Sequence, residues 1–351
     1  MSGADESLRT ILDNLLMEHS TSGMKLMDSG LNEEIMMMVK AKLADALLER
    51  LKSRTLDKLE TSKEIEDEFE DAVFRTWRKP LELLDLLLNI CFEVSSDFIS
   101  GSGSGPSSRR DYVQEVLARQ QANACLVFNE ILHLLKSGFP SGATSHWRNL
   151  HEMACISYFI SKHGNDVAKR FIDYEAVEAY FQTEAIHKHQ QNIECTSLSQ
   201  RDSKTLEKKL KTREKAYGDD FVKQSNYPYG WIPRTVLKTR SLKGIEKSVG
   251  LDTFRPYYDL AGYTLYGGHN TLVPKIGTMK KNSHVIIPAG PSNYGLADPG
   301  KNAAISLGQV TACFLMSGSG VKRLVIVEAL RNLVDEICDA FCEVEAEFGK
   351  E

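Results

Sequence analysis

The stretch "DYVQEVLARQQANACLVFNEILHLLKSG", residues 111–138, decides the fold class. Its apolar residues recur at three- and four-residue spacing, which is the pattern of an amphipathic α-helix. Gly138 and Pro140 follow the last apolar residue, and both residue types commonly end helices. The stretch therefore predicts one long helix with one face buried in a core.

The same periodicity continues on both sides of this helix. Upstream, it predicts helices over 33–59 and 62–100, and Pro80 is expected to kink or restart the second. Downstream, Thr144 or Ser145 is expected to cap the next helix. The downstream stretches that predict helices are 143–164, 165–193, 197–218, 301–316 and 321–348, with two short helices at 241–251 and 253–270. Alternation typical of a strand is almost absent, and "SHVIIPA", 283–289, is the exception.

These elements predict an all-α fold. We expect a multi-helix bundle with an N-terminal helical extension and one irregular, proline- and glycine-rich loop region at 271–300. The N-terminal helical region is predicted over 1–100 and the helical core domain over 110–348. Residues 101–109 are predicted to be a flexible linker, because glycine and serine support neither a helix nor a packed strand.

Composition limits the function classes. The net charge of −5 gives no overall attraction to nucleic acid or acidic lipid, although a local basic patch is compatible with it. The seven cysteines form no CxxC pair, as expected for buried thiols in a reducing compartment. We see no secretory signal and no apolar run of about 20 residues. We therefore expect a cytoplasmic protein that does not enter a membrane.

A charged group interrupts the apolar stretch "SHWRNLHEMACISYF", residues 145–159. Arg148 and Glu152 lie one helical turn apart, and His151 lies beside them. A charge in a core costs several kcal/mol unless it is paired. Two interpretations stay open: a buried structural ion pair, or a pair that lines a pocket together with a histidine.

The order of three motifs resembles a family. The Arg/Glu helix is followed by "YGWIP" at 229–233 and by the tyrosine-rich "GLDTFRPYYDLAGYTLYGGHNT" at 250–271. Over roughly residues 110–275 this order resembles a bacterial family of unknown function numbered 5677. Gly267 or Gly268 stands where that family often has serine. The matching positions are Arg148, Glu152, Trp231, Tyr258, Tyr266 and His269. The resemblance implies a helical bacterial protein, found near mobile and defence-type genes, with no settled activity.

These residues suggest a pocket for an anionic, phosphate or nucleotide-like ligand. Arginine clamps phosphate and histidine moves protons, so we expect Arg148, Glu152 and His269 to be the catalytic residues if there is chemistry. His151, Trp231, Tyr258 and Tyr266 are the expected ligand-binding residues. A phage-defence or toxin-type nuclease acting on nucleic acid fits this set. However, the Arg–His spacing of helical RNA-cleaving toxins is absent, so the sequence leaves open whether the protein is an enzyme.

Two alternatives come from other classes. One is a non-catalytic helical interaction protein with a buried Arg–Glu pair, acting as a homo-oligomer or with a protein partner. The other is a di-iron carboxylate bundle built from Glu130, His133, Glu184 and His187, because such bundles use two Glu-x-x-His motifs. A chain with nine histidines forms such motifs by chance, so we expect no metal and no cofactor.

Overall fold

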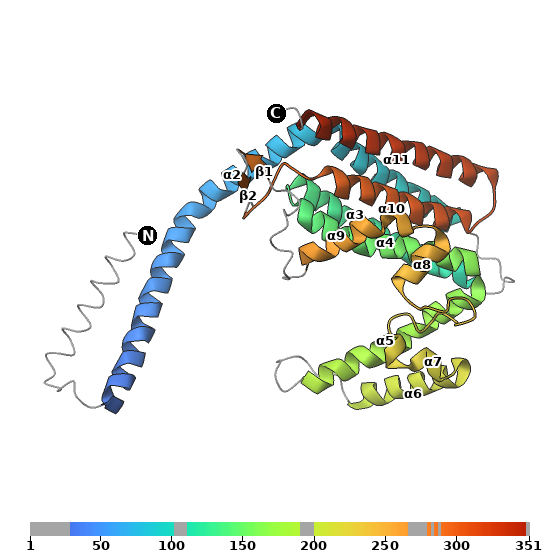
Figure 1. Ribbon diagram of the computed structural model, residues 1–351, viewed down its shortest axis with the longest axis horizontal. Helices are drawn as coiled ribbons and strands as arrows, with labels where there is room; N and C mark the ends of the chain where they lie inside the picture. Colours follow the sequence, from blue (N-terminus) through green and yellow to red (C-terminus); the bar gives the residue numbers. More distant parts are fainter. Residues whose placement is uncertain are drawn as a thin grey trace, which may run out of the picture. The chain divides into compact units, whose positions relative to one another are not determined.

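The structure, a computed structural model, describes residues 29–101, 111–189, 200–265, 279–281, 284–286 and 289–348. These residues are almost entirely helical, which confirms the predicted all-α, multi-helix fold (Figure 1). The elements are α2 (Ser29–Gly101), α3 (Tyr112–Lys136), α4 (Pro140–His163), α5 (Asn165–His189), α6 (Gln200–Tyr217), α7 (Asp219–Val222), η2 (Gln224–Asn226), α8 (Leu242–Val249), η3 (Asp252–Phe254), α9 (Arg255–Leu265), β1 (Met279–Lys281), β2 (His284–Ile286), α10 (Ala297–Met316) and α11 (Val321–Phe348).

The chain divides into two compact units, residues 1–71 and 72–351, and α2 runs through the boundary. The second part of α2 thus belongs to the same unit as the later helices. Of the expected linker at 101–109, only Gly101 is described, as the last residue of α2. The division into 1–100 and 110–348 stays a prediction. No helix of the described residues is both long and apolar enough to cross a membrane.

The predicted kink in α2 is present. Trp77 leaves helical geometry with φ −102° and ψ 22°, three residues before Pro80. Pro80 has no N–H for the carbonyl of Thr76 and its ring crowds that carbonyl, so the preceding turn must open. The Trp77 side chain is 1% exposed, and its Nε1 donates to Asn293 Oδ1 at 2.8 Å. The kink is therefore fixed by packing inside the second unit.

The boundaries of α3 follow the sequence, whereas the start of α4 does not. Asp111 caps α3 by accepting a hydrogen bond from the Gln114 N–H at 3.2 Å. The expected cap of α4 at Thr144 or Ser145 is wrong, because the helix already begins at Pro140. Proline needs no N–H at the first helical position and has the right φ there. The Thr144 hydroxyl instead donates to the Pro140 carbonyl at 2.8 Å, inside the helix.

Helix α4 lies at the centre of the second unit, where it packs against α3, α5, α8, α9 and α10. Trp147 of α4 is fully buried, and its Nε1 donates to Ser306 Oγ of α10 at 3.0 Å. Further along α10, the Thr311 hydroxyl donates to Gln121 Oε1 of α3 at 3.1 Å. A helix surrounded in this way has few positions open to water, so each polar side chain on it needs a partner.

Helices α10 and α11 form an antiparallel pair with very close packing at Gly300 (Figure 1). A Cβ atom on Gly300 would lie 2.2 Å from Cζ of Phe341, whose side chain is fully buried. We predict that Gly300→Ala lowers the free energy of unfolding by about 1–3 kcal/mol, since the extra methyl overpacks the core. Urea unfolding measures this. Gly290→Ala is the matched control, because nothing lies within 4 Å of its Cβ position; an equal effect in both variants would contradict the prediction.

Candidate functional site

His151, Glu246 and Arg255 form a triad that joins α4, α8 and α9, in which His151 and Glu246 are fully buried and Arg255 is half-buried. His151 Nε2 lies 3.0 Å from Glu246 Oε1, and both side chains are fully buried. Arg255 donates to the other carboxylate oxygen, Oε2, from Nη2 and from Nε at 2.8 Å. Burial works against the charge of Arg255, but the hydrogen bond and the charge of Glu246 outweigh it and raise the Arg255 pKa. The triad therefore contains a carboxylate–guanidinium ion pair that is held by two hydrogen bonds.

Local sequence explains why Glu246 points inward. Ser241 caps α8 by accepting from the Gly244 N–H at 3.1 Å, which fixes where the helix starts. Glu246 then shares the buried face of α8 with Leu242 and Ile245. Sequence reasoning missed both Glu246 and Arg255. The available signal was a glutamate in an apolar position of a short amphipathic helix, which predicts a buried and paired carboxylate.

A second group, here called the Arg148 cluster, consists of Arg148, Glu152 and Tyr258. The Tyr258 hydroxyl donates a hydrogen bond to Glu152 Oε1. The guanidinium carbon of Arg148 lies 4.1 Å from the centroid of the Tyr258 ring, and that of Arg255 lies 4.7 Å from it. Burial, followed by the bond to Glu152, raises the pKa of Tyr258 to about 12. Its hydroxyl is thus a protonated donor at neutral pH.

Tyr258 links Arg148 and Glu152, which the sequence suggested could pair directly. Within the described residues, the structure shows no ion pair between these two side chains. Both residues are half-buried, so neither is sealed in the core. Tyr258 is a residue of α9. Its ring lies against the guanidinium of Arg148, and its hydroxyl donates a hydrogen bond to Glu152. The Arg–Glu ion pair of this region is instead formed by half-buried Arg255 and fully buried Glu246.

The other expected ligand-binding residues have different surroundings. Trp231 is 2% exposed and packs edge-on against Phe159 and Phe171, while its carbonyl accepts from Arg170 Nε at 2.8 Å. These are the contacts of a core residue. His151 contacts Glu246 rather than an open surface.

Tyr266 and His269 lie outside the described residues, directly after α9. The predicted convergence of Arg148, Glu152 and His269 therefore stays a prediction.

Two residues of the triad form a group of potential metal ligands together with Cys155. Ligand atoms of His151, Cys155 and Glu246 lie within 4.8 Å of one another, and all three residues are buried. However, Arg255 already neutralises Glu246. Burial, and then the charges of Glu246 and Glu152, raise the pKa of the Cys155 thiol, whereas a metal needs the thiolate. His151 Nδ1 has no hydrogen-bond partner in the described residues, although metal-bound histidines usually anchor their second nitrogen. These contacts favour a hydrogen-bonded network.

The four residues of the di-iron alternative lie on two helices. Glu130 and His133 are exposed on α3, and Glu130 lies 3.4 Å from Nδ1 of His146. On α5, Glu184 is exposed and His187 is half-buried. Within the part of the chain that the structure describes, these residues do not form a group of converging metal ligands.

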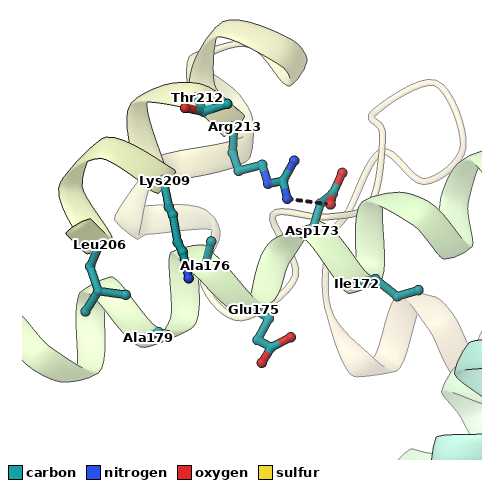
Figure 2. A pocket seen from close by; sticks show the side chains of 9 residues that line it. All are labelled: Ile172, Asp173, Glu175, Ala176, Ala179, Leu206, Lys209, Thr212 and Arg213. Atoms are coloured by element: carbon teal, nitrogen blue, oxygen red, sulfur yellow. Dashed lines mark ion pairs between the residues drawn. The ribbon is translucent and has the colours of Figure 1, made fainter. Parts of the chain in front are cut away.

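A separate polar cluster joins α5 to α6. Asp173 of α5 is 8% exposed and accepts from Lys169 Nζ at 2.6 Å and from the Tyr217 hydroxyl at 2.5 Å. Arg213 of α6 reaches toward the same carboxylate, with Nη2 at 2.9 Å (Figure 2). Burial alone would raise the pKa of Asp173, but the bonds from Lys169 and Tyr217 and the charge of Arg213 lower it overall. The carboxylate thus ties the two helices together.

This cluster predicts a pH effect on stability. Because the folded-state pKa of Asp173 lies below its ordinary value of 3.8, its contribution is complete above about pH 4 and is lost as the pH falls through the folded-state pKa. We predict that wild type exceeds Asp173→Asn in free energy of unfolding by a constant amount from pH 5 to 7. The difference should shrink below about pH 4. Urea unfolding at each pH measures it, and a difference that grows on acidification would contradict the assignment.

One protein-family model matches the part of the chain that contains the triad and the Arg148 cluster. No curated protein and no solved structure matches the chain. The model of the Family of unknown function (DUF5677) matches residues 114–265, which run from α3 to the end of α9. That span contains the triad and the Arg148 cluster and ends before Tyr266 and His269. The resemblance is therefore confirmed over this span: residues 114–265 of the chain match the family of unknown function DUF5677, as the order of the motifs predicted.

Proposed function

We propose that Arg148 binds an anionic ligand, a phosphate or a nucleotide-like molecule, on the face formed by α4 and α9. The observation that carries the proposal is a half-buried guanidinium that stacks on Tyr258 and has no carboxylate ion-pair partner among the described residues. The neighbouring Arg255, by contrast, is ion-paired with both Glu246 and Asp259. Arginine in such a position has donors left for a planar or tetrahedral anion, which it can bind bidentately.

The residues around Arg148 have different roles in the proposed site. Glu152 and Tyr258 orient each other, and the Tyr258 ring supports the guanidinium of Arg148. The triad holds α8 and α9 against α4, so we assign positioning roles to His151, Glu246 and Arg255. Tyr266 and His269, which follow α9 in sequence, belong to the same proposed ligand site.

The same proposal extends to a catalytic role for Arg148 and His269. With His269 as the proton carrier and Arg148 as the phosphate clamp, the site would suit phosphate chemistry. This requires the guanidinium of Arg148 and the ring of His269 to lie within about 12 Å of each other, the span of one small ligand in a pocket of ordinary size.

The wider role that we propose is a bacterial defence or toxin-type effector acting on nucleic acid in the cytoplasm. The resemblance to a family found near defence-type genes supports the first part. Free, buried thiols at Cys91, Cys125, Cys155 and Cys313 support a reducing compartment.

A helical interaction protein is the second candidate. It is favoured by an exposed apolar patch where α10 turns into α11. Met316, Val321, Leu324 and Val325 are 51%, 74%, 53% and 63% exposed there. Patches of this kind commonly mark contacts with a protein partner or a second copy of the chain. The Glu246–Arg255 pair would then serve stability alone.

Thermal unfolding in the presence of anions tests the ligand proposal. A ligand that binds only the folded state raises the melting temperature, and the rise grows with the logarithm of its concentration above the dissociation constant. We expect millimolar adenosine triphosphate, or inorganic phosphate, to raise it above the value in sodium chloride of equal ionic strength. No rise with either anion at concentrations up to tens of millimolar would refute an anion site.

A further inference from the structure

Positive charge is concentrated on helix α6. Its 18 residues, "QRDSKTLEKKLKTREKAY", contain seven lysines and arginines against three acidic residues, a net charge of +4. The whole chain, by contrast, has a net charge of −5. The charge of α6 is therefore a local feature of this helix rather than a consequence of overall composition.

The lysines of α6 lie along one side of the helix. Lys204, Lys208, Lys211 and Lys215 are separated by four, three and four residues, so they form one row, here called the lysine face. All four are exposed and line one shallow depression of about 650 Å³, together with Glu207 and Thr212.

Three of these lysines keep their charge available. Lys211 pairs with Glu207, with 2.7 Å between Nζ and Oε1. For Lys204, Lys208 and Lys215 the described residues provide no carboxylate partner at ion-pair distance. The lysine face therefore presents three ammonium groups that no described carboxylate neutralises.

The opposite side of α6 is anchored. Leu206 and Arg213 line the pocket of about 350 Å³ between α5 and α6, and Arg213 is bound to Asp173 (Figure 2). The Tyr217 hydroxyl at the end of α6 reaches the same carboxylate. Because these contacts fix one side of the helix on α5, the lysine face is held in a set orientation toward solvent.

We propose that the lysine face binds the phosphate backbone of a nucleic acid. From Lys204 to Lys215 the helix rises about 16 Å, so the row of lysines is long enough to contact several phosphates of one nucleic-acid strand. Lysines that contact phosphates release condensed counterions, which gives binding that is independent of sequence and weakened by salt. This surface is distinct from the Arg148 cluster, and the proposal does not rest on a ligand there.

A membrane surface would be a different partner for basic residues, but α6 lacks what it needs. Helices that lie on a bilayer insert large apolar side chains such as Trp, Phe or Leu beside their basic residues. Among the described residues of α6, no large apolar side chain is exposed, and Leu206 lines the pocket with α5. The lysine face is therefore purely polar, as a phosphate-backbone surface requires.

Fluorescence anisotropy with a labelled 20-nucleotide oligouridine RNA tests the proposal on the full chain. The test variant combines Lys204→Gln, Lys208→Gln and Lys215→Gln. The control combines Lys40→Gln, Lys42→Gln and Lys63→Gln, which removes the same charge from exposed positions on α2. We expect at least a tenfold loss of affinity in the test variant and less than a twofold change in the control. The slope of log affinity against log salt should fall by about 2, at about 0.7 per lost contact on a single strand.

Three outcomes would overturn the proposal. Wild type could fail to bind the RNA, the test and control variants could lose the same affinity, or the chain could bind phosphatidylserine vesicles through these lysines in place of RNA. Circular dichroism of the test variant checks that α6 still folds. The test variant should keep the rise in melting temperature with inorganic phosphate that the Arg148 proposal predicts, so a failure of that proposal and a failure of this one give different results.

Discussion

Replacing Glu246 by glutamine is expected to lower the free energy of unfolding by about 3–5 kcal/mol, the cost of removing one partner from a buried ion pair. Glutamine has nearly the same shape, so the change removes the charge with little loss of packing. After the substitution, Arg255 and His151 face a neutral amide at position 246. The side chain of Arg255 is 20% exposed and that of His151 is fully buried. Urea unfolding followed by circular dichroism measures the effect.

Two further variants isolate the ion pair. Glu82→Gln removes an exposed carboxylate that pairs with Arg78 at 2.8 Å, and should change stability by less than about 1 kcal/mol. Combining Glu246→Leu with Arg255→Met should be less destabilising than Glu246→Leu alone, since apolar side chains can replace a buried pair. A double variant that loses the sum of both single effects would contradict the assignment of the triad.

Arg148→Ala is expected to weaken binding of adenosine triphosphate by about 10- to 150-fold, since a hydrogen-bonded contact to a charged group contributes about 1.5–3 kcal/mol. Arg148→Lys should recover only part of the affinity. Lysine keeps the charge but lacks the planar fork and the flat surface that stacks on Tyr258. Isothermal titration calorimetry at constant ionic strength measures both variants.

Arg119→Ala is the matched control for this experiment. Arg119 lies exposed on α3 and pairs with Glu115 at 2.7 Å, so its loss removes the same charge away from the Arg148 cluster. We expect its affinity to stay within twofold of wild type. Equal weakening by Arg119→Ala and Arg148→Ala would show that net charge, and not a site at Arg148, attracts the anion.

Much of the fold follows from hydrophobic periodicity. The helix predicted over 111–138 is observed as Tyr112–Lys136, and the kink predicted from Pro80 is observed at Trp77. The α3 helix and the α2 kink depend on residues within one or two helical turns of each other, so a short stretch of sequence is enough to predict them. The predicted start of α4 was wrong because a proline at position 140 is compatible both with the end of α3 and with the first position of α4.

The candidate site depends on contacts between distant parts of the chain. Arg148 and Glu152 were found because both lie in one apolar stretch of α4. Their bridge, Tyr258, comes from 106 residues beyond Glu152, and spacing along a helix could not show that its hydroxyl would reach the carboxylate. Glu246 lies 95 residues after His151, and only the packing of α8 on α4 brings the two together.

An experimentally determined structure of the chain with bound phosphate tests the Arg148 site most directly. The quantity to measure is the shortest distance between a phosphate oxygen and the guanidinium nitrogens of Arg148. We predict about 3 Å, a direct hydrogen bond, with Tyr258 still beneath the guanidinium. Phosphate ordered at other positions while Arg148 makes no contact with it would contradict an anion site at Arg148.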